Sequence, residues 1–368
     1  MNIKITSQMI AEFARITGDQ SSLHVDQDFA RRMMFRKPVS HGCLPLVFLM
    51  AHPDLALVSG WISSFSVKFL KPVFAADELE LSIKEAKPGV YKFVFTKAGG
   101  IVTQGQVSFS TTALPVRMQE GPDVMASSLI QQDQSWDFLQ VGQESDISFQ
   151  VSSHVGIALS RLCGAQAISK SWENLWALLM TSTFVGMTLP GKWGMFLSLQ
   201  VNFKSRVSSQ GPCTWKGQIE TKSDATKIVT LACQLYDVKA SIAEATIMAR
   251  VNTTPIKMSS LKEVQVKIGD MGLKDQVVLI TGASRGIGEV MAKAFGIHGA
   301  KVAVHYFKGK DDAEAIVSEL KSSGIKAIAV GADVSQESQV KAMVKQVRKE
   351  LGDIDVLVNN AVADAMSI

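Results

Sequence analysis

The hydrophobic pattern of the first third of the chain predicts one buried helix followed by strands. An almost unbroken apolar run over residues 44–57 is long enough for a buried helix. Alternating apolar and polar positions predict a half-buried strand over residues 64–73, and further strands follow over residues 91–95 and 101–110. Residues 119–145 then turn polar and rich in Gln, Ser and Asp, and we interpret them as a linker.

The pattern of residues 1–118 recurs in residues 146–251. In the first aligned pair of segments Ser, Arg, Gly and Gln coincide without a gap, and most apolar positions match. Two tandem copies of one domain are the economical explanation. Three pairs of segments carry the repeat: residues 153–166 align with 7–20, residues 198–207 with 64–73, and residues 241–249 with 101–109.

A different pattern follows a second predicted linker at residues 252–274. Strands and helices alternate over residues 275–368, which predicts a parallel sheet with crossover helices. The predicted strands cover residues 277–281, 301–306, 325–330 and 354–359, and the predicted helices cover residues 286–299, 311–322 and 335–351.

Composition narrows the class of protein. A length of 368 residues indicates two or three domains, and 46% hydrophobic with 20% charged residues is ordinary for a globular protein. The net charge of +4 does not indicate a partner such as nucleic acid. The N-terminus lacks a basic segment followed by an apolar one, so we expect neither a secretory signal nor a membrane span. Cys43, Cys163, Cys213 and Cys233 lack CxxC spacing, which favours neither a metal site nor disulfides and indicates a reducing, cytoplasmic compartment.

The candidate chemistry lies in residues 13–42. Asp19 and His24 stand five positions apart in a segment too rich in Gly, Ser and Asp for one continuous helix. His41 and Gly42 then open the apolar run. An acid/base pair moves protons, and free N–H groups at a helix start stabilise negative charge growing on oxygen. This layout suits a carbonyl substrate.

These residues resemble the signature of MaoC-like (R)-specific enoyl thioester hydratases and dehydratases, a branch of the hot-dog fold. Ser21 and Ser22 depart from that family's Gly-Asp-x-Asn-Pro-Leu-His pattern by replacing Asn and Pro. The resemblance implies a helix wrapped by an antiparallel sheet, with Asp19, His24 and Gly42 as catalytic residues. It is carried by Asp19, Leu23, His24, Asp26, Ala30, Phe35, Val39, His41 and Gly42.

The implied reaction interconverts (3R)-hydroxyacyl and 2-enoyl thioesters of acyl carrier protein or coenzyme A. His41 either contacts substrate or serves the structure, and Cys43 is interpreted as a packing residue. Two alternatives stay open: a hot-dog thioesterase, and a non-catalytic scaffold that binds an acyl carrier protein. A homo-oligomer is compatible with all of them.

The second copy has lost these catalytic side chains. In the alignment Asp19 falls on Ala165 and His24 on Lys170, while His41 and Gly42 fall near residues 175 and 176. Alanine transfers no proton, so we interpret residues 146–251 as a non-catalytic repeat that covers the edge of the first sheet.

The C-terminal segment contains TGASRGIG at residues 281–288, directly after a predicted strand and at the start of a helix. With Asp333-Val334 and Asn359-Asn360-Ala361 it resembles the first half of a short-chain dehydrogenase/reductase of the ketoreductase kind. No acid follows the second strand and Arg285 lies in the loop, so the resemblance favours NADP(H). The implied cofactor-binding residues are Gly282, Ser284, Arg285, Gly286, Ile287, Gly288, Asp333, Val334 and Asn360.

That family's catalytic Ser, Tyr and Lys lie beyond the Asn-Asn-Ala-Gly motif, whose last position is Val362 here. We therefore expect residues 275–368 to be a truncated reductase domain. A ketoreductase makes the 3-hydroxyacyl group that a dehydratase consumes, so the fusion points to fatty acid or polyketide-type synthesis, with acyl-CoA degradation left open. The predicted fold is an α+β tandem (double) hot-dog followed by a partial α/β Rossmann domain.

Overall fold

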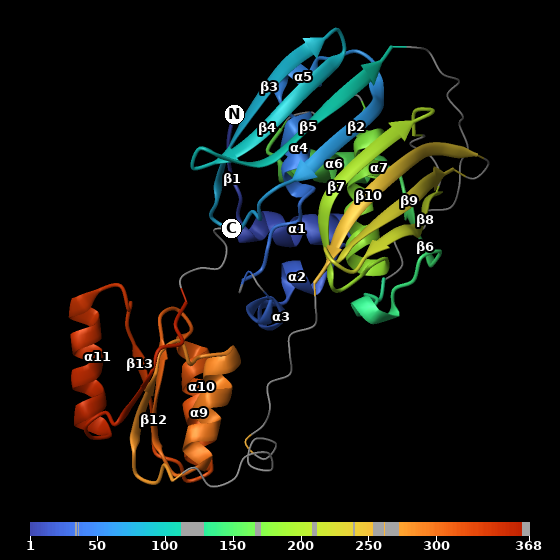
Figure 1. Ribbon diagram of the computed structural model, residues 1–368. Coiled ribbons are helices and arrows are strands. Elements are labelled where there is room, and N and C mark those ends of the chain that lie inside the picture. Colours follow the sequence, from blue (N-terminus) through green and yellow to red (C-terminus); the bar gives the residue numbers. More distant parts are fainter. Residues whose placement is uncertain are drawn as a thin grey trace. The chain divides into compact units, whose positions relative to one another are not determined.

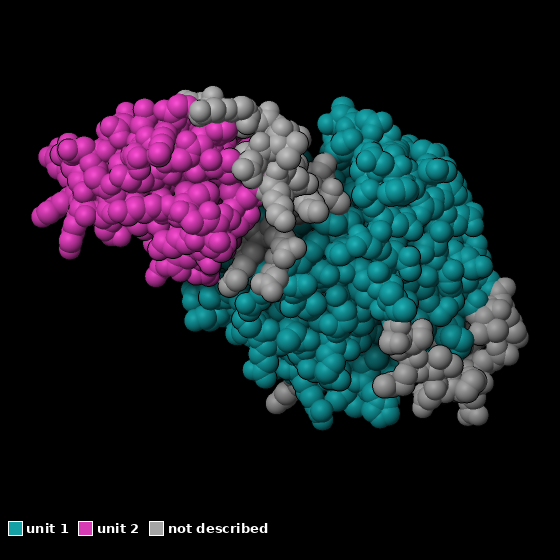
Figure 2. All heavy atoms as spheres, turned by 90° about the horizontal axis from the view of Figure 1, so that it is seen from below, with its two compact units in different colours: residues 1–255 teal, residues 256–368 magenta. Residues whose placement is uncertain are grey.

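The computed structural model describes residues 1–33, 35, 37–111, 129–165, 171–207, 212–237, 240–252, 261 and 272–362. The chain divides into two compact units, residues 1–255 and residues 256–368 (Figure 2). None of the helices in the described part is long and apolar enough to cross a membrane.

Unit 1 contains a sheet that has ten strands among the described residues, and these form two equivalent halves (Figure 1). The first half runs β1-β3-β4-β5-β2 and the second β7-β10-β9-β8-β6, joined by the antiparallel pair β2·β7. Each strand of one half therefore has a counterpart at the mirrored position of the other, which confirms the predicted tandem hot-dog. The strands are β1 Asn2–Lys4, β2 Trp61–Phe69, β3 Glu78–Lys87, β4 Val90–Lys97, β5 Gly100–Ser110, β6 Glu144–Gln150, β7 Gly194–Phe203, β8 Pro212–Ser223, β9 Ile228–Tyr236 and β10 Ser241–Val251.

The helices of both halves share one hydrophobic core with the sheet. Leu46 of the first half and Leu178 of the second are fully buried members of the same cluster. The helix α7 is buried on every side from Glu173 to Thr183, and a π-helical turn η2 continues it. The helical segments are α1 Ser7–Thr17, α2 Ser22–Val25, α3 Gln27–Arg32, α4 Leu44–Met50, α5 Pro53–Ala56, η1 Trp136–Phe138, α6 Ser153–Leu162, α7 Trp172–Thr183 and η2 Phe184–Thr188.

The prediction of one continuous helix over residues 44–57 is wrong. The run divides into α4 and α5, with His52 extended at φ −65° and ψ 134° between them. Pro53 causes the break, because its ring disfavours helical backbone at the preceding residue and it has no N–H to donate. Pro45 lies in the first turn of α4, where the missing N–H would be unpaired in any case.

Part of the first predicted linker has defined structure. Within residues 129–145, Trp136 is 5% exposed and its indole N–H donates to Asp224 at 2.6 Å. Residues 112–128 lie outside the described part, as does most of the second predicted linker, so both linker boundaries stay predictions.

Unit 2 is a parallel sheet of order β13-β12-β11-β14 in the described residues, with α10 joining β12 to β13. One hydrophobic cluster contains Leu320 of α10, and another contains Val347 of α11. This arrangement confirms the predicted partial Rossmann domain. Its elements are β11 Val277–Ile280, α9 Gly286–Ile297, β12 Lys301–Tyr306, α10 Lys310–Ser322, β13 Ala327–Gly331, α11 Glu337–Glu350 and β14 Val356–Val358.

Candidate functional site

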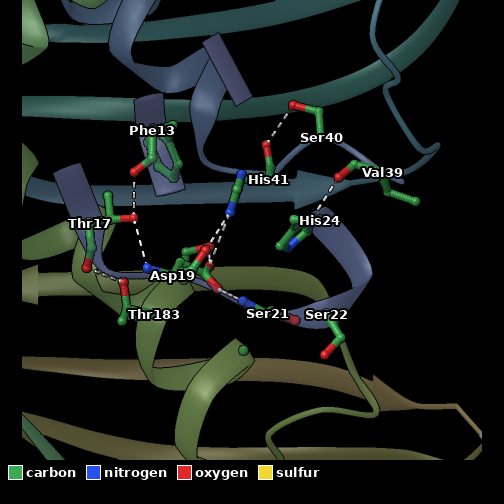
Figure 3. Close-up of polar contacts among 12 residues, drawn as sticks. Phe13, Thr17, Asp19, Ser21, Ser22, His24, Val39, Ser40, His41 and Thr183 are labelled. Atoms are coloured by element: carbon green, nitrogen blue, oxygen red, sulfur yellow. Dashed lines mark hydrogen bonds and ion pairs between the residues drawn. The ribbon is translucent and has the colours of Figure 1, made fainter. Parts of the chain in front are cut away.

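The end of α1 sets the position of Asp19. Gly18 adopts φ +73°, a left-handed conformation that favours glycine, and its N–H donates to Ala14 O. The Thr17 hydroxyl donates to Phe13 O at 2.8 Å and accepts from the Asp19 N–H at 3.2 Å (Figure 3). The chain therefore leaves the helix in a fixed direction, with Asp19 buried just beyond it.

The Asp19 carboxylate is held from both repeats. Its Oδ2 accepts from the Ser182 hydroxyl of α7 at 2.8 Å, and its Oδ1 accepts from the Ser21 N–H at 3.3 Å. Burial raises the pKa of this carboxyl, while His24, Ser182 and Ser21 oppose the rise. A carboxyl with a raised pKa is suited to exchanging protons near neutral pH.

His24 lies on α2 and has one nitrogen committed. Its Nδ1 donates to the Val39 carbonyl at 2.7 Å, because a carbonyl oxygen can only accept. In the neutral imidazole this leaves Nε2 as the proton acceptor. The ring stacks on that of His41, with centroids 3.9 Å apart and planes 33° apart.

His41 supports Asp19 through the backbone. It is fully buried, and its Nε2 donates to the Asp19 carbonyl at 2.9 Å (Figure 3). Burial, reinforced by the charge of His24, holds the pKa of His41 well below its usual range, so the ring is neutral. Of the two roles considered for His41, these contacts favour the structural one.

Gly42 and Cys43 precede α4 and leave their N–H groups available. Neither N–H donates to any residue that the structure describes. A Cβ on Gly42 would come within 3.2 Å of the Phe69 ring, so the position favours glycine. Burial raises the pKa of the Cys43 thiol, which makes Cys43 a poor nucleophile.

Asp19, His24 and His41 each offer one ligand atom within 4.8 Å of the other two. A tetrahedral zinc ion with bonds of about 2.0–2.2 Å would need its ligand atoms about 3.3 Å apart. The His41 Nε2 and the Asp19 Oδ2 also already have hydrogen-bond partners. The group therefore fits proton transfer better than metal binding.

The structure thus brings Asp19 and His24 together and puts Gly42 beside His41. Ser182 was not predicted as a site residue, and its only signal in the sequence is the polar run 181–183 after the apolar run 175–180. In the second repeat, Ala165 follows α6 without an ionisable side chain. Lys170 lies outside the described residues. The positions matched to His41 and Gly42, Leu175 and Trp176, are buried in α7.

In unit 2 the glycine-rich segment forms a tight loop between β11 and α9. Gly282 and Gly286 adopt φ +64° and +60°, which favour glycine. A Cβ on Gly288 would lie 2.6 Å from Gly282 O and 2.6 Å from the Asn360 amide nitrogen. That amide donates to the carbonyls of Thr281 and Gly282 at 3.0 Å each.

His305 is a second residue that the sequence reasoning missed. Its Nδ1 accepts from the Gly282 N–H at 3.0 Å, and its Nε2 donates to Ala332 O at 3.0 Å. Burial lowers the pKa of His305, which keeps the ring neutral and able to accept this bond. His305 therefore links the glycine loop to the segment that follows β13.

The other predicted cofactor residues lie between β11 and the first turn of α9 or just after β13. Asp333 accepts from the Ser335 N–H and hydroxyl, and these bonds lower the pKa of its carboxyl. Ser284 is nearly buried, Arg285 is exposed, and Ile287 and Val334 are 75% and 48% exposed.

Comparisons with known proteins recognise both parts of the chain. A family model described as a MaoC like domain matches residues 1–112, and one described as short chain dehydrogenase matches residues 276–367. The 3-oxoacyl-[acyl-carrier-protein] reductase FabG of Staphylococcus epidermidis is 48% identical over 83 residues, 23% of this chain and 34% of that protein. An uncharacterized oxidoreductase of Methylorubrum extorquens is 46% identical over 89 residues, 24% of this chain and 36% of that protein. The chain therefore spans about a third of the length of the curated relatives it matches.

Among solved structures, a MaoC domain protein from Chloroflexus aurantiacus aligns with a TM-score of 0.50 and 12% identity, covering 69% of this chain and 93% of that one. At this identity the likeness shows the fold alone. A short chain dehydrogenase from Burkholderia cenocepacia, in complex with NADP, is 40% identical over 25% of this chain and 37% of that one, with a TM-score of 0.24. The two family matches confirm the resemblances drawn from the sequence: the chain carries a MaoC-like domain in residues 1–112 and a short-chain dehydrogenase domain in residues 276–367.

Proposed function

We propose that unit 1 reversibly dehydrates (3R)-hydroxyacyl thioesters to 2-enoyl thioesters. The observation that carries the proposal is that the Asp19 carboxyl and the His24 imidazole lie next to each other. The Ser182 hydroxyl orients the carboxyl through Oδ2, and the Val39 carbonyl orients the imidazole through Nδ1. The MaoC-like family match supports a reaction of the hydratase and dehydratase class.

In the hydration direction Asp19 and His24 hold the attacking water between them. The His24 Nε2 takes a proton from the water while hydroxide adds to Cβ, the protonated Asp19 carboxyl donates a proton to Cα, and the proton on His24 then returns to Asp19. General acid/base catalysis of this kind contributes about 100- to 10,000-fold in rate. In the reverse direction the same two groups protonate the leaving hydroxyl and remove the Cα proton.

The free N–H groups of Gly42 and Cys43 are the proposed binding site for the thioester oxygen. Negative charge develops on that oxygen in the enolate-like transition state, and the two N–H donors would stabilise it there. One such donor contributes about 100- to 1000-fold in rate.

Unit 2 is proposed to bind NADP(H), which supplies or accepts a hydride when bound. The left-handed Gly286 has no atom within 4 Å of the place where a Cβ would lie, which leaves room for a pyrophosphate beside the loop, and Gly288 lets the loop close against Gly282 O and the Asn360 amide. Arg285 would accompany the extra phosphate of NADP(H), and no carboxylate lies among residues 305–308 to repel it. The acyl-carrier-protein reductase among the relatives supports acyl thioesters of carrier protein, and therefore chain synthesis, as the context.

Hydration of crotonyl-CoA by the full chain tests the lyase proposal. Asp19→Asn and His24→Ala should each lower kcat by at least about 100-fold while the protein stays folded, because each removes one proton-transferring group. The matched controls are Asp54→Asn and His52→Ala, an exposed carboxyl and a partly buried imidazole 3.7 Å apart in the same repeat. Near-normal hydration by either site variant would refute the assignment, and release of free coenzyme A would indicate a thioesterase instead.

A further inference from the structure

Residues 129–133, which we call the strap, run between the two repeats beside α2. Backbone bonds fix the strap to the second repeat, from the Gln132 N–H to Met187 O and from the Lys192 N–H to Gln132 O, both at 2.9 Å. The Asp133 carboxylate also accepts from Lys192 Nζ at 2.7 Å and from the Trp193 indole at 2.8 Å. The strap is therefore a fixed point from which a side chain can hold a neighbouring segment.

Gln131 reaches from the strap to both sides of the candidate active site. Its Oε1 accepts from the Ser22 hydroxyl at 2.8 Å and from the Ser22 N–H at 3.3 Å. Its Nε2 donates to Gly186 O at 2.8 Å. Ser22 begins α2, which carries His24, and a Cβ on Gly186 would lie 2.6 Å from Asp19 Oδ1.

The start of α2 needs this acceptor. Ser21, the residue that precedes the helix, makes no side-chain capping bond, so the free N–H at Ser22 depends on a partner from elsewhere. Serine at the first helical position brings two donors, its N–H and its hydroxyl, where proline would bring none. Gln131 Oε1 accepts both.

We propose that Gln131 is a positioning residue that keeps His24 and Asp19 at their working separation. It joins the helix that carries one group to the turn that packs against the other. The inference rests on the proposed lyase function. A displacement of about 1 Å in a reacting group can lower a rate by about 100-fold, so loss of this link should act on turnover.

The experiment compares Gln131→Met, which keeps the length of the side chain and removes both polar groups, with the matched control Gln132→Met on the exposed next residue. Hydration of crotonyl-CoA is measured from pH 5 to 9. We expect kcat to fall about 10- to 100-fold in Gln131→Met with KM changed less than about twofold. The limb of the kcat profile that reports the Asp19 pKa should move to higher pH, since Asp19 loses the nearby His24 charge that opposes its raised pKa.

A second substitution isolates the cap. Ser21 has φ −54° and ψ 130°, which suits a residue before proline, so Ser22→Pro is compatible with the backbone. Ser22→Pro should restore much of the kcat of Gln131→Met, because it removes the two donors that Gln131 accepts. If Gln131→Met fails to fold, the test compares the double variant Ser22→Pro/Gln131→Met with the single variant Ser22→Pro. Equal kcat values for these two variants would support the capping role.

The outcomes separate the two proposals. No hydration by the unaltered chain would remove the proposed lyase function itself. If the unaltered chain is active and Gln131→Met has the same kcat as Gln132→Met, the role of Gln131 is overturned while the lyase stays in place. The same holds if kcat falls in Gln131→Met but the pH profile does not move and Ser22→Pro restores nothing.

Discussion

The burial of Asp19 favours proton transfer but lowers the stability of the folded protein. Burial disfavours its charged form, and three hydrogen-bonding or charged neighbours only partly compensate. A carboxyl with a raised pKa holds its proton more tightly than an exposed one, and it therefore exchanges protons closer to neutral pH. The same environment makes the ionised carboxylate a cost to folding at neutral pH.

Replacing Asp19 by Asn should therefore stabilise the folded protein at pH 7. The folded pKa of Asp19 lies above its usual 3.8, so the folded state loses stability as pH rises through the folded pKa, and Asn carries no such loss. Thermal melts should show a higher Tm for Asp19→Asn at pH 7 and a gain that shrinks as pH falls toward 4. A lower Tm than the unaltered chain at pH 7 would contradict this account of the site.

Ser182, in the second repeat, donates a hydrogen bond to the Asp19 carboxylate of the first repeat. Removing its hydroxyl takes away one of the bonds that oppose the raised pKa of Asp19, so Ser182→Ala should raise that pKa further. We expect kcat for hydration to fall about 10-fold, the scale of one hydrogen bond to a charged group, and the limb of the pH profile that reports the Asp19 pKa to move to higher pH. Ser160→Ala is the control, since that hydroxyl donates to Gly156 O within α6. An unmoved limb would mean that Ser182 serves packing only.

At the scale of elements, the hydrophobic pattern predicted some strands of unit 1 and missed others, among them β8 and β9, whose buried and exposed positions alternate. The strand β3 was not predicted, because Glu78–Lys87 alternates only in its first half and then exposes charged residues. The predicted strand over residues 64–73 is shifted, since β2 covers Trp61–Phe69. Pro53 causes the break between α4 and α5, and the prediction missed this local effect because it relied on the length of the apolar run.

The π-helical turn η2 gives a prediction of its own. Gly186 has no side chain where Asp19 Oδ1 approaches, and a Cβ there would lie 2.6 Å from that oxygen and 3.1 Å from the Ser21 Cβ. Gly186→Ala should push the carboxyl aside, lowering kcat about 10- to 100-fold and the free energy of unfolding by about 1–3 kcal/mol. Gly100→Ala is the control, because its Cβ would meet only ordinary contacts from 3.4 Å outward. Normal kinetics for Gly186→Ala would show that the turn does not confine Asp19.

At the scale of the whole molecule, long-range partners explain what sequence spacing left out. Asp19 and His24 are close in the chain, so a local motif revealed both. Ser182 lies 163 positions from Asp19 and Gln131 lies 109 positions from Ser22, and no local spacing records those contacts. The tandem repeat predicted that a second sheet would be present, but not that its helix would hold the acid of the first.

Units 1 and 2 have separate hydrophobic cores, which predicts that their activities can be removed one at a time. Gly288→Val would force side-chain atoms against Gly282 O and the Asn360 amide, so NADPH binding by the full chain should be lost while kcat for crotonyl-CoA hydration changes less than about twofold. Asp19→Asn should do the reverse. Ala315→Val, at an exposed position of α10, should leave both intact. Fluorescence titration with NADPH and the hydration assay measure the two activities in one preparation. Loss of hydration in Gly288→Val would mean that the lyase depends on the nucleotide-binding unit, and the two units would then have to be treated as one catalytic body.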